Sequence, residues 1–120
     1  MGWIFESDRP IYAQLVDQLR LRIVTGVYSP GERISSVREL AGEAGVNPNT
    51  MQRALSELES SGLIYSQRTS GRFVTDDPEQ IRAARKSIAD EEIRAFLGRM
   101  KALGLAREEV LELLEDYNYE

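Results

Sequence analysis

Side chains that can hydrogen-bond to the edges of nucleic-acid bases gather in one short stretch of this sequence. They comprise two short amides, a hydroxyl, a longer amide and a guanidinium: Asn47, Asn49, Thr50, Gln52 and Arg53. An Asn or Gln amide pairs with adenine, and an Arg guanidinium pairs with guanine. None of these groups requires burial. We therefore expect them to face outward as a surface that reads bases or contacts phosphates.

The element that carries these groups is predicted to be a helix. Asn47 is a good N-cap and Pro48 suits the first helical position. The apolar residues then follow at helical spacing and would form the buried face: Met51, Ala54, Leu55 and Leu58. This helix should run to about Ser61, before Gly62.

A second helix should precede it by a short turn. Ser36 and Glu39 fit a capping box, and Gly45 suits the left-handed conformation that ends a helix. An earlier helix over residues 10–25 has one wide apolar stripe. Two helices joined by about three residues that include a glycine form the helix-turn-helix arrangement.

A β-hairpin is predicted directly after the third helix. Residues 63–67 and 72–75 are rich in β-branched and aromatic side chains, and the segment between them has Ser-Gly turn chemistry. The hairpin would present two arginines around a small tip: Arg68, Thr69, Ser70, Gly71 and Arg72. Such a wing suits the DNA backbone or a minor groove. The predicted fold is mostly α with a small β-hairpin, a winged helix-turn-helix.

Residues 77–120 are expected to form a helical tail after a DNA-binding domain of residues 1–76. The tail carries an imperfect apolar seam followed by a last helix over about 107–117. The seam could pack on the first helix of its own domain. A homodimer interface is favoured, because a monomer of this size would leave much of the seam exposed. The interface residues predicted here are Ile81, Ala84, Ile88, Ile93, Phe96, Leu97 and Met100.

Composition narrows the function further. The net charge is −5, but acidic and basic residues balance in 1–75, so the excess of acid belongs to the tail and does not argue against DNA binding. Histidine and cysteine are absent, which removes the commonest general base and metal ligands. We expect no catalysis, no metal site and no cofactor, and we interpret Asp90, Glu91 and Glu92 as a solvated face. With no apolar run long enough for a membrane span and no signal peptide, a cytoplasmic location is expected.

Residues 9–75 also resemble the N-terminal domain of the GntR family of bacterial regulators. The motifs that carry the resemblance occur in order along the chain: the Pro-Gly turn before Arg33-Ile34, then residues 36–41, 46–50, 58–64 and 71–74. The short helical tail is similar to the YtrA-type branch, whose members are small dimeric regulators and often repressors. Ser35 departs from the proline that family members commonly carry.

The resemblance implies roles for individual residues. Arg38 matches a basic position that contacts DNA phosphate or base, and Ser36 opens the same motif. Asn47, Asn49 and Thr50 match the contacting start of the recognition helix, and Gly71 matches the wing-tip glycine. Gln52 falls where some relatives use arginine, so the base that it reads stays open.

The leading hypothesis is thus a homodimeric repressor of an inverted-repeat operator. The alternative is a winged-helix module that binds proteins, which should expose apolar or acidic groups on the third helix, where this sequence has Asn, Thr, Gln and Arg. A small-molecule effector, if there is one, would have to bind between subunits or between tail and head, because about 45 residues after the wing are too few to enclose a pocket.

Overall fold

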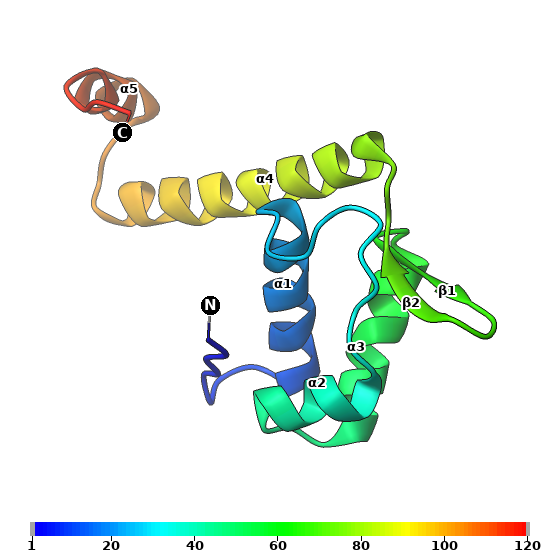
Figure 1. The fold of residues 1–120 in the computed structure, drawn as a ribbon. Coiled ribbons are helices and arrows are strands. Elements are labelled where there is room, and N and C mark those ends of the chain that lie inside the picture. Colours follow the sequence, from blue (N-terminus) through cyan, green and yellow to red (C-terminus); the bar gives the residue numbers. More distant parts are fainter. Residues whose placement is uncertain (1, 120) are drawn as a thin grey trace. The chain divides into compact units, whose positions relative to one another are not determined.

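A computed structural model describes residues 2–119. Its elements, in chain order, are α1 (Ile11–Val24), α2 (Val37–Ala44), α3 (Pro48–Ser60), β1 (Ile64–Gln67), β2 (Gly71–Val74), α4 (Pro78–Ala102) and α5 (Arg107–Glu115) (Figure 1). The fold is mostly helical, with one antiparallel hairpin, as the sequence predicted. The predicted boundaries agree closely; the last helix ends at Glu115, short of the predicted Tyr117.

The chain divides into two compact units. The first ends at Arg85 and the second begins at Lys86, so the boundary lies inside the continuous helix α4. The first turns of α4 belong to the first unit because Ile81 is buried there and Arg85 Nη2 donates to the carbonyl of Val24 at 3.0 Å. The sequence predicts the boundary between the DNA-binding domain and the helical tail earlier, after residue 76.

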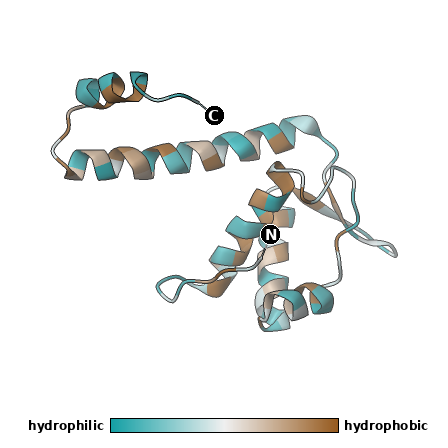
Figure 2. Cartoon of the chain, turned by 60° about the vertical axis from the view of Figure 1, so that its left-hand side comes forward, coloured by the Kyte–Doolittle hydropathy of each residue, from teal (hydrophilic) through white to brown (hydrophobic). Residues whose placement is uncertain are grey.

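Helix α3 is central to the first unit and contacts α1, α2 and β1. The core joins the apolar faces of these helices to the inner side of the hairpin, and it includes Leu15, Leu19, Leu40, Met51, Leu55, Leu58, Ile64 and Val74. In Figure 2 the hydrophobic stripes of the helices in this unit alternate with hydrophilic faces. The spacing of apolar residues therefore decides which side of α3 stays outside.

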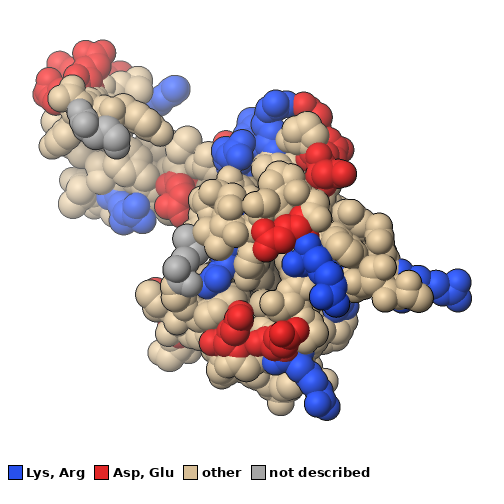
Figure 3. Space-filling view, viewed as in Figure 1, with Lys and Arg blue, Asp and Glu red and all other residues tan. Residues whose placement is uncertain are grey.

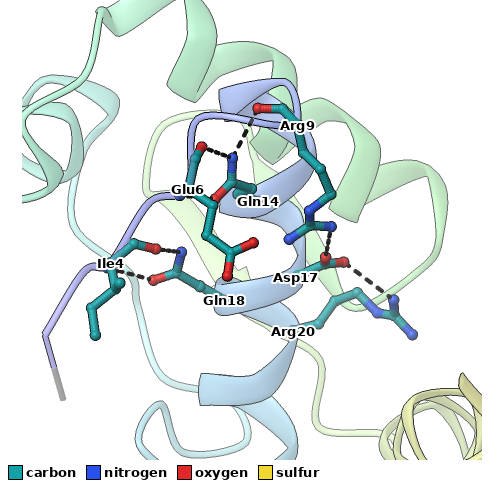
Figure 4. Close-up of polar contacts among 7 residues, drawn as sticks. All are labelled: Ile4, Glu6, Arg9, Gln14, Asp17, Gln18 and Arg20. Atoms are coloured by element: carbon teal, nitrogen blue, oxygen red, sulfur yellow. Dashed lines mark hydrogen bonds and ion pairs between the residues drawn. The ribbon is translucent and has the colours of Figure 1, made fainter. Parts of the chain in front are cut away.

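The segment before α1 is attached to that helix through its main chain (Figure 4). Gln14, only 2% exposed, donates to the carbonyls of Glu6 and Arg9 at 2.8 and 2.9 Å and accepts from the N–H of Glu6 at 2.7 Å. One helical turn later, Gln18 accepts from the N–H of Ile4 at 3.3 Å and donates to its carbonyl at 2.7 Å. Two side-chain amides thus pair with an extended peptide.

No helix within residues 2–119 combines the length and apolar character needed to cross a membrane.

Candidate nucleic-acid interface

The outward face of α3 is set by how the helix begins and by what it buries. The side-chain oxygen of Asn47 accepts the N–H of Asn49 at 2.8 Å, and Pro48 occupies the first turn. Met51, Ala54 and Leu55 are fully buried. Asn49, Gln52 and Arg53 consequently lie exposed on the opposite side of the helix, with Thr50 half-buried beside them.

Three of the predicted contact residues on α3 already have partners within the chain. The oxygen of the Asn47 amide is used as a helix cap, which leaves its NH₂ group to donate. Gln52 donates to the hydroxyl of Ser56 at 3.2 Å. The guanidinium of Arg53 lies 3.5 Å from the ring centroid of Tyr12 on α1. No local sequence pattern predicts this last contact, because Tyr12 and Arg53 lie on different helices.

The start of α2 forms the predicted capping box. Ser36 Oγ accepts from the N–H of Glu39 at 3.2 Å, and the Glu39 carboxylate accepts from the N–H of Ser36 at 3.1 Å. The backbone and hydroxyl of Ser36 hold the pKa of Glu39 below its usual value. The hydroxyl of Ser36 keeps its own proton to donate. Arg38, one residue into the helix, is exposed.

The hairpin places its basic residues in two different environments. Its strands pair in the register Ile64 with Val74 and Gln67 with Gly71, and the rings of Tyr65 and Phe73 stack with centroids 5.8 Å apart. At the tip, Arg68, Thr69 and Ser70 are exposed, and in Figure 3 basic atoms extend from the end of the hairpin. Arg72 is half-buried and bound to Glu59 at the end of α3, Nε to Oε1, at 2.5 Å. Arg72 therefore ties the wing to α3 besides carrying positive charge.

Arg33 is a further basic residue of this region, and it is not among the contact residues that the sequence predicts. It precedes α2 and pairs with Phe73 in an isolated antiparallel bridge. Its Nε donates to the carbonyl of Ser70 at 2.7 Å, and its guanidinium lies over Gly71. The sequence signal was a single arginine after the Pro-Gly turn, and the contact spans 37 residues of chain, so local patterns could not reveal it.

Three arginine residues are among those that line one hollow between the start of α2 and the wing. The hollow has a volume of about 470 Å³ and is lined by Arg33, Ile34, Ser35, Ser36, Val37, Arg38, Ser66, Gly71 and Arg72. The residues that line it include the N-terminus of α2, whose N–H groups and helix dipole favour negative charge. The hollow thus has the chemistry of an anion site, and guanidinium groups suit the oxygens of a phosphate in particular.

The predicted interface residues are spread over both units. Ile81 is buried within the first unit. In the second, Ile93, Phe96 and Leu97 line an apolar groove of about 520 Å³ with α5 residues Arg107, Val110, Leu111 and Leu114. Ile93 is 54% exposed and Leu97 is 42% exposed. Ala84, Ile88 and Met100 are half-buried.

Residues 11–74 match the family model of bacterial regulatory proteins of the gntR family. The chain is 38% identical over 113 residues to the HTH-type transcriptional regulator YhcF of Bacillus subtilis, covering 94% of this chain and 93% of that protein. A GntR family transcriptional regulator from Listeria monocytogenes superimposes with a TM-score of 0.85 at 37% identity, over 95% of this chain and all of that one. AraR(DBD), solved in complex with operator ORX1, is similar over 62% of this chain and 99% of that one, with a TM-score of 0.56 and 29% identity.

Proposed function

This chain belongs to the gntR family of bacterial regulatory proteins, and from that premise we propose that it is a homodimeric repressor that binds an inverted-repeat operator. It is a DNA-binding transcriptional regulator with a winged helix-turn-helix, and its family is one of regulators rather than enzymes.

The observation that carries the proposal is the polar outer face of α3 beside an arginine-lined hollow. α3 would enter the major groove, where Asn49, Thr50 and Gln52 reach base edges and Asn47 donates from the first turn. Arg38, Ser36 and the N-terminus of α2 would bind a backbone phosphate. This division matches how helix-turn-helix proteins separate positioning contacts from base reading.

The wing would contribute a second set of contacts. Arg68 extends from an exposed tip formed by Thr69, Ser70 and Gly71, a shape that suits a minor groove or the adjacent backbone. Arg72 would act from the hollow while bound to Glu59. The operator complex of AraR(DBD), similar in fold to the winged domain here, supports operator binding as the task of these elements.

Dimerisation is proposed through the second unit. Val110 is the one hydrophobic residue buried there among residues 86–119, whereas Ile93, Leu97, Leu111 and Leu114 each expose 42% to 54% of their surface. A unit with so little core requires a partner. A second copy would cover the groove formed by α4 and α5 and would place two reading heads about one helical turn apart on DNA. Repression follows if the bound dimer occupies a promoter, as in many YtrA-type regulators that the short tail resembles.

Selection of bound duplexes from a randomised library tests this function. The wild-type chain should recover an inverted repeat, and Asn49→Ala should relax the preference at one position of each half-site. Arg38→Ala is the matched control, since loss of a phosphate contact weakens binding about equally on all sequences. Recovery of no preferred sequence by the wild-type chain would contradict the proposal and would favour a protein-binding module.

A further inference from the structure

Arg53 on α3 is held by an aromatic ring from another helix. Its guanidinium carbon lies 3.5 Å from the centroid of Tyr12, which sits half-buried in the first turn of α1. Arg53 itself is exposed. Among the ion pairs of residues 2–119, none involves Arg53. Its charge is therefore not neutralised by a carboxylate and is open to an external anion.

Stacking on a ring leaves the hydrogen-bonding capacity of a guanidinium intact. The cation presents its flat face to the aromatic ring, while its five N–H donors lie in the plane and point away at the edges. These donors match two oxygens of a phosphate. A stacked arginine has also lost much of its rotamer freedom before it binds, so less entropy is lost on contact.

The position of the ring decides what Arg53 can reach. The base-contacting residues of a recognition helix lie near its N-terminus. Arg53 lies one turn beyond Asn49, farther from that end. Its stack on Tyr12 draws the guanidinium sideways toward α1. A helix in the major groove has base edges beneath it and sugar-phosphate strands at its sides. A side chain turned toward a neighbouring helix is directed to the strand and away from the bases.

We propose that Tyr12 is a positioning residue of the DNA interface, which holds the Arg53 guanidinium against α1 so that it binds a backbone phosphate and does not read a base. The proposal rests on the proposed DNA-binding function and deepens it. For Arg53 it selects phosphate contact, where the sequence leaves both base reading and phosphate contact open. The proposal also gives α1, which packs against α3, a part in DNA binding.

A double-mutant cycle tests the pair. The variants are Tyr12→Leu, Arg53→Gln, their combination, and Tyr12→Phe, which keeps the ring. Each is titrated at several salt concentrations with two probes: the duplex selected by the wild-type chain and an unrelated duplex of the same length. Tyr12→Leu and Arg53→Gln should each weaken binding, by about fivefold to tenfold, in equal ratio on both duplexes, and lower the salt slope by about one. The double variant should bind no more weakly than Arg53→Gln, and Tyr12→Phe should match the wild type.

Three results would overturn the proposal: additive losses in the double variant, an unchanged salt slope in Arg53→Gln, or a larger loss by Arg53→Gln on the selected duplex than on the unrelated one. Unfolding midpoints establish that each variant is folded. If Tyr12→Leu does not fold, Arg53→Lys replaces it, because lysine keeps the charge and lacks the planar face; it should lose affinity in the wild-type background. Failure of the wild type to bind any duplex would count against the proposed function, whereas normal wild-type binding with an inert Arg53 would refute this inference alone.

Discussion

Arg72 on the second strand of the wing donates to Glu59 in the last turns of the recognition helix, with Nε and Oε1 2.5 Å apart. The same carboxylate oxygen accepts from the hydroxyl of Ser66 on the first strand at 2.8 Å. Glu59 therefore joins both strands of the hairpin to α3. Because the reading helix and the wing must contact one DNA duplex together, their relative placement depends on this carboxylate.

The bond makes part of the stability of the first unit dependent on pH. Arg72 chiefly, with Ser66, lowers the pKa of Glu59. A carboxyl with a lowered folded pKa contributes stability that is complete above its unfolded value, near 4.3, and is lost as the pH falls through the folded value. Glu59→Gln should therefore lower the free energy of unfolding at pH 7 by about 1 kcal/mol and lessen its acid dependence. Urea denaturation at neutral and acidic pH measures both effects.

Glu57→Gln is the control for that experiment. Glu57 lies on the same helix, is exposed, and takes part in no ion pair among the described residues. Its substitution should leave the decrease in the free energy of unfolding at acidic pH the same as in the wild type. Equal behaviour of the two variants would show that the bond to Arg72 contributes nothing in solution.

Replacing Gly71 with alanine should damage the wing. Gly71 has φ of +103°, a conformation that L residues rarely adopt, and a Cβ would lie 3.1 Å from Nε of Arg33. We expect Gly71→Ala to cost about 1–3 kcal/mol of stability. Gly42→Ala is the matched change in the helix α2, where a Cβ meets nothing within 4 Å, and it should stabilise by up to about 1 kcal/mol. Thermal unfolding of both variants measures these changes in stability. A Gly71→Ala variant as stable as the wild type would show that alanine is not strained at this position.

Loss of Arg33 should loosen the tip of the hairpin. Its bond to the carbonyl of Ser70 and its place over Gly71 hold the turn from outside the hairpin. Arg33→Ala should speed amide hydrogen exchange in residues 66–72 and weaken DNA binding. Arg68→Ala is the control, because it removes a tip charge without removing this bond: it should weaken binding and leave exchange unchanged. Identical exchange rates in Arg33→Ala and the wild type would rule out the holding role.

A charge placed in the apolar groove of the second unit should dissociate the proposed dimer. Leu97 lines that groove and is 42% exposed. Leu97→Lys should give a monomer in sedimentation equilibrium and lower affinity for an inverted repeat by about tenfold or more, since one head offers few phosphate contacts. Ala95→Lys adds the same charge on the opposite side of α4 by helical spacing and should leave the dimer intact. A dimeric Leu97→Lys would place the interface elsewhere.

The elements of this fold follow from local signals in the sequence. The capping box at Ser36, the Asn47-Pro48 start of α3 and the spacing of Met51, Ala54 and Leu55 each depend on neighbours within a turn or two. Such signals place helices and show which face is buried. They also predict which polar side chains of α3 face outward.

The contacts between distant segments could not be predicted in this way. Arg53 looked free in sequence, because its partner Tyr12 lies on a different helix. Arg72 looked like an exposed wing charge, yet it is half-buried against Glu59. The role of Arg33 cannot be predicted locally, because it depends on the path of the hairpin. Arginine has a long side chain with five donors, so its partner is decided by tertiary structure more than by neighbours in sequence.

The paired glutamines of α1 bear on how this protein can change over evolutionary time. Among residues 2–119, the side-chain amides of Gln14 and Gln18 bond to main-chain atoms of Ile4, Glu6 and Arg9, groups that almost every amino acid supplies. Mutations at residues 4 and 6 can therefore accumulate without detaching the segment, provided that proline does not remove either N–H. Arg9 is constrained further, because its side chain pairs with Asp17 on α1 at 3.0 Å. Gln14 has no such latitude, because its side chain is buried and a shorter one would lose its three bonds to the segment. Selection should thus fall on the helix, while the segment attached to it drifts.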